Sequence, residues 1–194
     1  MTDDIWLNRI EDIKYFETDP QLSREQVISF GQKLRSEYYE QLPAIVDAIE
    51  LADQKELYPL HSDFFSRLGM TFDHGDYSRI DAIKDKTKIA EKLYLKSLHY
   101  YPDVRAYLGL GILYQKNRDY ENSIRILSEG LGHFSDDEQI NICLAVSLMN
   151  VGAYPKALAY LLRFQHSQQA LGFIATCYQA LNEVEKAAAI RKRL

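Results

Sequence analysis

The chain has 194 residues, 46% of them hydrophobic, which fits one domain or a compact domain with an extension and excludes a disordered chain or a collagen-like fibre. Its 23 basic and 28 acidic residues give a formal net charge of −5, which argues against nucleic-acid binding. Only 9 Gly and 5 Pro are present, so turn-forming residues are scarce and the composition favours helices over a many-stranded sheet.

The N-terminal residues do not form a secretory signal, because Asp3 and Asp4 precede the first apolar residues where a signal has basic ones. No apolar run approaches the roughly 18 residues that cross a bilayer. The two cysteines, Cys143 and Cys177, form no CxxC pair, and their apolar helical surroundings predict buried structural thiols. We therefore expect a soluble cytoplasmic protein without membrane association.

Residues 1–57 read as a helical segment of their own. An apolar stripe at helical spacing predicts a short amphipathic helix, and its members are Trp6, Ile10, Ile13 and Phe16. The sequence from Ser23 to Gln26 has the form of a capping box that opens a second helix. Pro43 suits the first turn of a third.

Two later stretches match at a constant spacing of 34 residues. Four pairs of positions agree in size: Leu110 with Leu144, Gly111 with Ala145, Tyr120 with Tyr154, and Ser123 with Ala157. Asn141 departs from the pattern, since the earlier copy has the bulky Tyr107 there. A third copy begins at Leu171, about four residues early, which predicts that the preceding second helix or its turn is shortened.

An earlier copy starts with Phe65, Leu68 and Gly69 on a first helix. Between Tyr77 and Ala90 the chain has about ten residues more than the repeat requires. Helical spacing continues through that excess, so we predict that the second helix of this copy is lengthened at its start.

The period and the order of small and bulky residues resemble the tetratricopeptide (TPR) repeat family. The resemblance implies an all-α fold, a right-handed superhelix of TPR-like helical hairpins over residues 58–194 that follows the N-terminal helical segment of residues 1–57. In each hairpin a small residue on the first helix is expected to meet a small residue on the second. Six tyrosines fall on packing positions of the pattern: Tyr94, Tyr107, Tyr114, Tyr120, Tyr154 and Tyr178.

Catalytic signatures are missing. No P-loop, HExxH or G-x-S-x-G sequence occurs, and the five histidines lack metal-ligand spacing. We expect no catalytic residue, no cofactor and no metal, and we do not expect an enzyme.

In the TPR family the first helices line a concave groove that takes a peptide or a partner helix. The resemblance places the following residues on that partner-binding groove: Arg105, Leu108, Ile112, Gln115, Lys116, Ile142, Val146, Met149, Thr176 and Gln179. The family's clamp for a C-terminal carboxylate requires several basic residues, and here only Arg105 and Lys116 are basic. The central stripe is apolar and needs a cover.

These residues predict a non-catalytic protein-interaction module, an adaptor, scaffold or assembly factor. Three occupants could cover the stripe: a helix or apolar peptide of a protein partner, residues 1–16 of the same chain, or a second copy in a homodimer. Two alternative functions stay open. The Leu108–Gly111 stretch resembles helical-repeat chaperones of type III secretion, and the lack of a polar helix after the last repeat suggests an accessory domain of a larger enzyme.

Overall fold

The computed structural model describes residues 58–74 and 86–194, and it divides the chain into two compact units, 1–101 and 102–194. The predicted helices of residues 1–57 lie outside the described residues, as does the extension of a second helix through Ile80 and Ile83. The predicted boundary between residues 57 and 58 stays a prediction.

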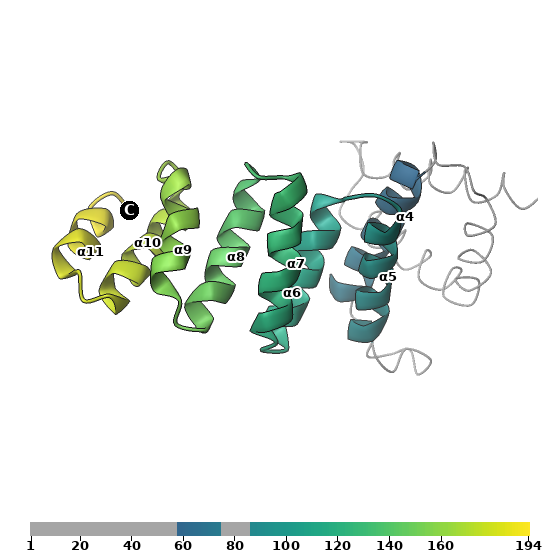
Figure 1. The fold of residues 1–194 in the computed structure, drawn as a ribbon, viewed down its shortest axis with the longest axis horizontal. Coiled ribbons are helices and arrows are strands. Elements are labelled where there is room, and N and C mark those ends of the chain that lie inside the picture. Colours follow the sequence, from purple (N-terminus) through teal and green to yellow (C-terminus); the bar gives the residue numbers. More distant parts are fainter. Residues whose placement is uncertain (1–57, 75–85) are drawn as a thin grey trace, which may run out of the picture. The chain divides into compact units, whose positions relative to one another are not determined.

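The described residues form helices and contain no strand, which confirms the all-α fold predicted from the sequence. Figure 1 shows these helices, which in chain order are α4 (Tyr58–His74), α5 (Lys86–Tyr100), α6 (Val104–Lys116), α7 (Tyr120–His133), α8 (Glu138–Asn150), α9 (Tyr154–Leu161), the 3₁₀ helix η2 (Leu162–Phe164), α10 (Gln168–Ala180) and α11 (Val184–Arg191).

Helices α4 and α5 form a close pair in the first unit. A Cβ added to Gly69 would lie 2.8 Å from ring carbons of Tyr94, so only glycine permits this approach. Ala90, which the repeat pattern pairs with Gly69, is fully buried one turn before Tyr94. The hydroxyls of Ser62 and Ser97 lie 3.0 Å apart in a buried hydrogen bond, which also requires closely spaced helices.

The second unit consists of three consecutive hairpins, α6–α7, α8–α9 and α10–α11, and each second helix of the first two hairpins also packs on the next first helix (Figure 1). The predicted contact between small residues is present in the first of them, where Ser123 Oγ donates to the carbonyl oxygen of Gly111 at 2.9 Å. Leu127 covers Gly111, where a Cβ would lie 2.6 Å from the leucine side chain. The close packing of this hairpin therefore depends on the absence of a side chain at Gly111.

The turns between the two helices of each hairpin share one backbone conformation. Arg118, Gly152 and Asn182 have φ angles of 60°, 77° and 61°. Arg118 and Gly152 are 34 residues apart, and Asn182 follows 30 residues later. The residue with a positive φ thus recurs once in each hairpin at the same point of the repeat. Its shorter spacing before Asn182 reflects the third copy, which begins about four residues early.

The shortening that the sequence predicts before the third copy lies in α9. This helix has 8 residues and continues into the three residues of η2, whereas α7 has 14 residues. The second helix of this hairpin, α9 followed by η2, therefore contains fewer residues than α7 and ends in a tightly wound 3₁₀ turn. As a result, α10 begins earlier in the sequence than a 34-residue period would place it.

One equivalent position of the second helices is a buried leucine in the first two hairpins and an exposed arginine in the third. Leu127 in α7 and Leu161 in α9 are fully buried. Arg191 holds the equivalent position of α11, 30 residues after Leu161, and is exposed. Val184, at the start of α11, is 54% exposed. At the position of Leu127 and Leu161, α11 therefore has a charged and exposed residue.

Candidate protein-binding face

The first helices of the three hairpins contact one another in succession, α6 with α8 and α8 with α10. Among the described residues, the second helices α7 and α9 contact each other less than the first helices α6 and α8 do. Nine predicted groove residues lie half-buried or exposed on these first helices, and we call the surface they form the first-helix face: Arg105, Leu108, Ile112, Gln115, Lys116, Val146, Met149, Thr176 and Gln179.

Ile142, the tenth predicted residue, does not belong to this face, because it is only 1% exposed. The physical reason is its place on α8, which contacts α6, α7, α9 and α10 and is therefore enclosed on both sides. Leu108, at the equivalent position of α6, stays half-buried. We therefore remove Ile142 from the candidate residues and assign it to the core.

Gln115 joins two hairpins instead of pointing freely to solvent. Its Nε2 donates to the carbonyl oxygen of Cys143 at 2.8 Å and to Ser147 Oγ at 2.7 Å. Ser147 Oγ lies 2.7 Å from Ser123 Oγ, which extends the network into α7. Because Ser123 and Ser147 are fully buried, these bonds satisfy polar groups that would otherwise be costly in the interface.

Arg105 belongs to the cap of its own helix. Asp103 precedes α6 and accepts a hydrogen bond from the backbone nitrogen of Arg105 at 2.8 Å. The guanidinium group returns to the same carboxylate, with Nε 3.1 Å from Oδ1 and Nη2 2.7 Å from Oδ2. The charge of this predicted ligand residue is therefore largely compensated within the chain.

The part of the face on α10 is more open and more polar than the part on α6 and α8. Gly172 corresponds to Leu108 and Ile142, and nothing lies within 4 Å of a Cβ added to it. Thr176 Oγ1 donates to the carbonyl oxygen of Gly172 at 3.0 Å, and Gln179 is exposed. The positions of α10 that correspond to the apolar residues of α6 and α8 are therefore Gly172, Thr176 and Gln179.

Cys177 is buried as predicted, but Cys143 is only half-buried on α8, as is Phe173, which sequence reasoning missed, at the equivalent position of α10. The repeat register could have identified them, since both correspond to Gly109 of α6. Burial, with a smaller contribution from Asp137, raises the pKa of the Cys143 thiol to about 11, and burial raises the pKa of Cys177 to the same value. Both thiols are thus protonated near neutral pH, as structural cysteines would be.

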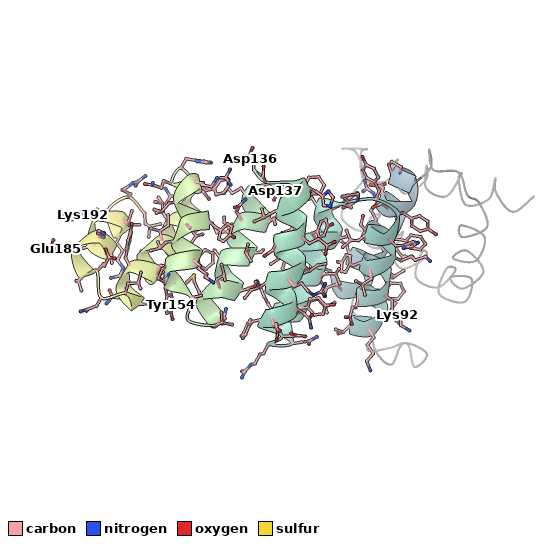
Figure 2. The ribbon with its side chains drawn as sticks, in the orientation of Figure 1. Lys92, Asp136, Asp137, Tyr154, Glu185 and Lys192 are labelled. Atoms are coloured by element: carbon pink, nitrogen blue, oxygen red, sulfur yellow. The ribbon has the colours of Figure 1, made fainter. Side chains whose placement is uncertain are left out.

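Two acidic side chains, Asp136 and Asp137, belong to the turn before α8. Figure 2 shows Asp136 and Asp137 in the turn that leads into α8, at the opposite end of the helices from Tyr154. Asp137 caps α8 by accepting from the backbone nitrogen of Ile140 at 2.9 Å. Arg163 pairs with Asp136 and donates to the carbonyl oxygen of Ser135 at 3.1 Å. These carboxylates serve the turns.

Neither a metal centre nor a membrane span is found in the described part of the chain. No three His, Cys, Asp or Glu side chains come together there as metal ligands would. Each helix of residues 58–74 and 86–194 is too short or too polar to cross a bilayer.

Comparisons with protein families and with curated protein sequences gave no match. Among solved structures, the chain is similar to MamA AMB-1 P212121, with a TM-score of 0.53 and 19% identity over 93% of this chain and 90% of that one. It is also similar to a mutant form of MamA, with a TM-score of 0.51 and 20% identity over 84% and 86% of the two chains. These likenesses support a TPR-like helical-repeat fold.

Proposed function

We propose that this chain is a non-catalytic protein-interaction scaffold of the TPR type, which binds a partner segment on the first-helix face. The observation that carries the proposal is the succession of contacts from α6 to α8 to α10. Helices on the inner side of a curved stack approach one another more closely than those on the outer side, so the first helices are assigned to the concave side.

Partly exposed apolar side chains on this side support the same proposal. Leu108 and Ile112 of α6 and Val146 and Met149 of α8 are all half-buried. Apolar surface that is grouped on one side of a repeat protein is typical of a binding surface. We assign no catalytic role to the chain.

The proposal is tested by affinity capture with the full-length chain, followed by mass spectrometry. We expect the double variant Ile112→Glu/Val146→Glu to lose the captured partners, because two carboxylates would have to be buried against apolar contacts. Leu162→Glu is the matched control, since Leu162 is 37% exposed on η2 and lies off the first helices. Circular dichroism verifies that both variants fold. Full retention of every partner by the folded double variant would exclude the face.

A further inference from the structure

The two junctions between hairpins of the second unit are built from different side chains. At the first junction, between α6–α7 and α8–α9, Gln115 Nε2 donates to Ser147 Oγ, which also shares a hydrogen bond with Ser123 Oγ of α7. The repeat gives the corresponding positions of the second junction, between α8–α9 and α10–α11. They hold residues without an amide or hydroxyl group in the side chain: Met149, Ala157 and Cys177.

The second junction is closed by apolar packing. Within the described residues, no hydrogen bond joins α8 or α9 to α10 or α11. Helices α8 and α10 also contact each other less than α6 and α8 do, and α9 and α10 less than α7 and α8. Gly172 of α10 stands where α8 has the buried Ile142, and a Cβ added to it would meet nothing within 4 Å. Hydrogen bonds are directional and apolar contacts are not, so the angle between hairpins is less firmly fixed here.

The connection between these hairpins changes sides between Phe164 and Gln165. Arg163 donates to the carbonyl oxygen of Ser135 at 3.1 Å, which ties η2 to the turn before α8. Arg193, which follows α11, donates to the carbonyl oxygen of Gln165 at 2.9 Å and to its Oε1 at 3.1 Å. Neighbouring residues of the connection are therefore held by different hairpins.

Two links cross this point within the described residues. The backbone nitrogen of Ser167 donates to the carbonyl oxygen of Phe164 at 2.9 Å, which closes the turn itself. His166 Nε2 lies 3.5 Å from Glu138 Oε2, but this is an ion pair only when the histidine is protonated, and its side chain is 72% exposed. Exposed pairs of this kind contribute little to stability. Neither link involves a residue of α10.

We propose that the second junction is a hinge. The pair α10–α11 undocks from α8–α9 as a folded unit by rotation between Phe164 and Gln165, while the first junction stays closed. The α10 part of the first-helix face then moves relative to α6 and α8, which changes the curvature of the array. The hinge is a property of the second unit and stands whether or not the first-helix face binds a partner.

The thiol of Cys177 reports this opening. Cys177 is fully buried and corresponds to Ser147, which contacts α7 across the first junction. The variant Cys143→Ser leaves it as the single cysteine of the full-length chain. We expect its labelling by a disulfide reagent to proceed through an opening whose urea dependence is less than about half that of global unfolding, measured by circular dichroism. Equal urea dependence would overturn the proposal.

Hydrogen exchange followed by NMR distinguishes undocking from local unfolding. If α10 stays helical when it undocks, its backbone amides should be protected at least about tenfold more strongly than the Cys177 thiol. Equal protection of the amides and the thiol would mean that α10 unfolds in place, and the hinge would be excluded.

A substitution at the second junction tests the cause of the opening. Met149→Gln supplies the amide that Gln115 supplies to the first junction, so it should slow the labelling of Cys177 at least about threefold, the effect of one added hydrogen bond. Val151→Gln is the matched control, because it adds the same amide where the side chain is 52% exposed, and it should leave the rate within about 1.5-fold. No slowing by Met149→Gln, or equal slowing by both variants, would contradict the hinge.

Discussion

The hairpins α6–α7 and α8–α9 fill the same place in the repeat with opposite residues. In the first, Tyr107 is buried and a Cβ added to Gly130 would lie 2.9 Å from its ring, so a large residue faces an absent side chain. Thirty-four residues later, Asn141 is fully buried in place of the tyrosine and Phe164 is 8% exposed in place of the glycine. The large and small residues have changed sides.

We infer from this exchange that the repeat preserves volume at this interface more strictly than residue type. The smaller residue also acquires a polar role. Asn141 Nδ2 donates to the carbonyl oxygens of Ser135 at 3.1 Å and Asp137 at 2.8 Å, which fixes the turn before α8. Its Oδ1 is buried without a hydrogen-bond partner, so the exchange leaves one acceptor unsatisfied.

The largest effect is expected when the second hairpin is given the residues of the first. Phe164→Gly should destabilise the fold by about 3–4 kcal/mol, because it removes a buried aromatic side chain. Asn141→Tyr alone should cost about 1–3 kcal/mol through overpacking. If the side chains at positions 141 and 164 fill one shared space, the double variant should be about 1–3 kcal/mol more stable than the summed effects of the two single variants predict.

Urea unfolding of the wild type, both single variants and the double variant measures this coupling. A conservative control is Phe164→Leu combined with Asn141→Tyr, which should recover less stability than the full exchange. Strict additivity of the two substitutions would show that Asn141 and Phe164 do not share a volume, and the comparison of the hairpins would be wrong.

A smaller effect on stability is expected at the two glutamines of the first-helix face, Gln115 and Gln179, and it should differ between them. Gln115→Ala should cost about 1–2 kcal/mol, because it removes two hydrogen bonds that join α6 to α8. Gln179→Ala, at the equivalent position of α10, should change stability by less than about 0.5 kcal/mol because Gln179 is exposed. Thermal unfolding followed by circular dichroism compares the two. Equal effects would mean that the Gln115 bonds do not join the hairpins in solution.

The smallest effect concerns the turns. Arg118 adopts a φ of 60°, where Gly152 stands in the next hairpin, so Arg118→Gly should stabilise the chain by about 0.5–1 kcal/mol. Asn182→Gly should gain only a few tenths of a kcal/mol, since asparagine tolerates this conformation. The reverse change, Gly152→Arg, should destabilise. A loss of stability in Arg118→Gly, measured by the urea midpoint, would contradict the strain that we assign to this turn.

The repeat architecture could be predicted from the sequence because its determinants are periodic. Gly111, Ser123 and Tyr120 recur in kind at fixed spacing, and each small residue is placed where two helices must approach. The early third copy was predictable for the same reason, and the short α9 with η2 confirms it. The alignment of successive repeats can therefore be predicted from the spacing of small and bulky residues.

The candidate site could be predicted only in part, since helical spacing gives the side of a helix and not the neighbours that cover it. Ile142 was assigned to the face by its position on α8, but that helix is enclosed by four others. Gln115 was assigned as a ligand residue, but it bonds to a carbonyl of the next hairpin, which no spacing reveals. Contacts between elements decide these cases.

The charged position of α11 has a consequence for any contact that would cover this helix. Leucine stands at the equivalent positions of α7 and α9 and is buried there, whereas Arg191 is exposed. A contact that buried Arg191 would remove water from its guanidinium group, which is costly unless an acidic partner replaces that water. The exchange of a leucine for an arginine therefore disfavours purely apolar packing on this side of α11.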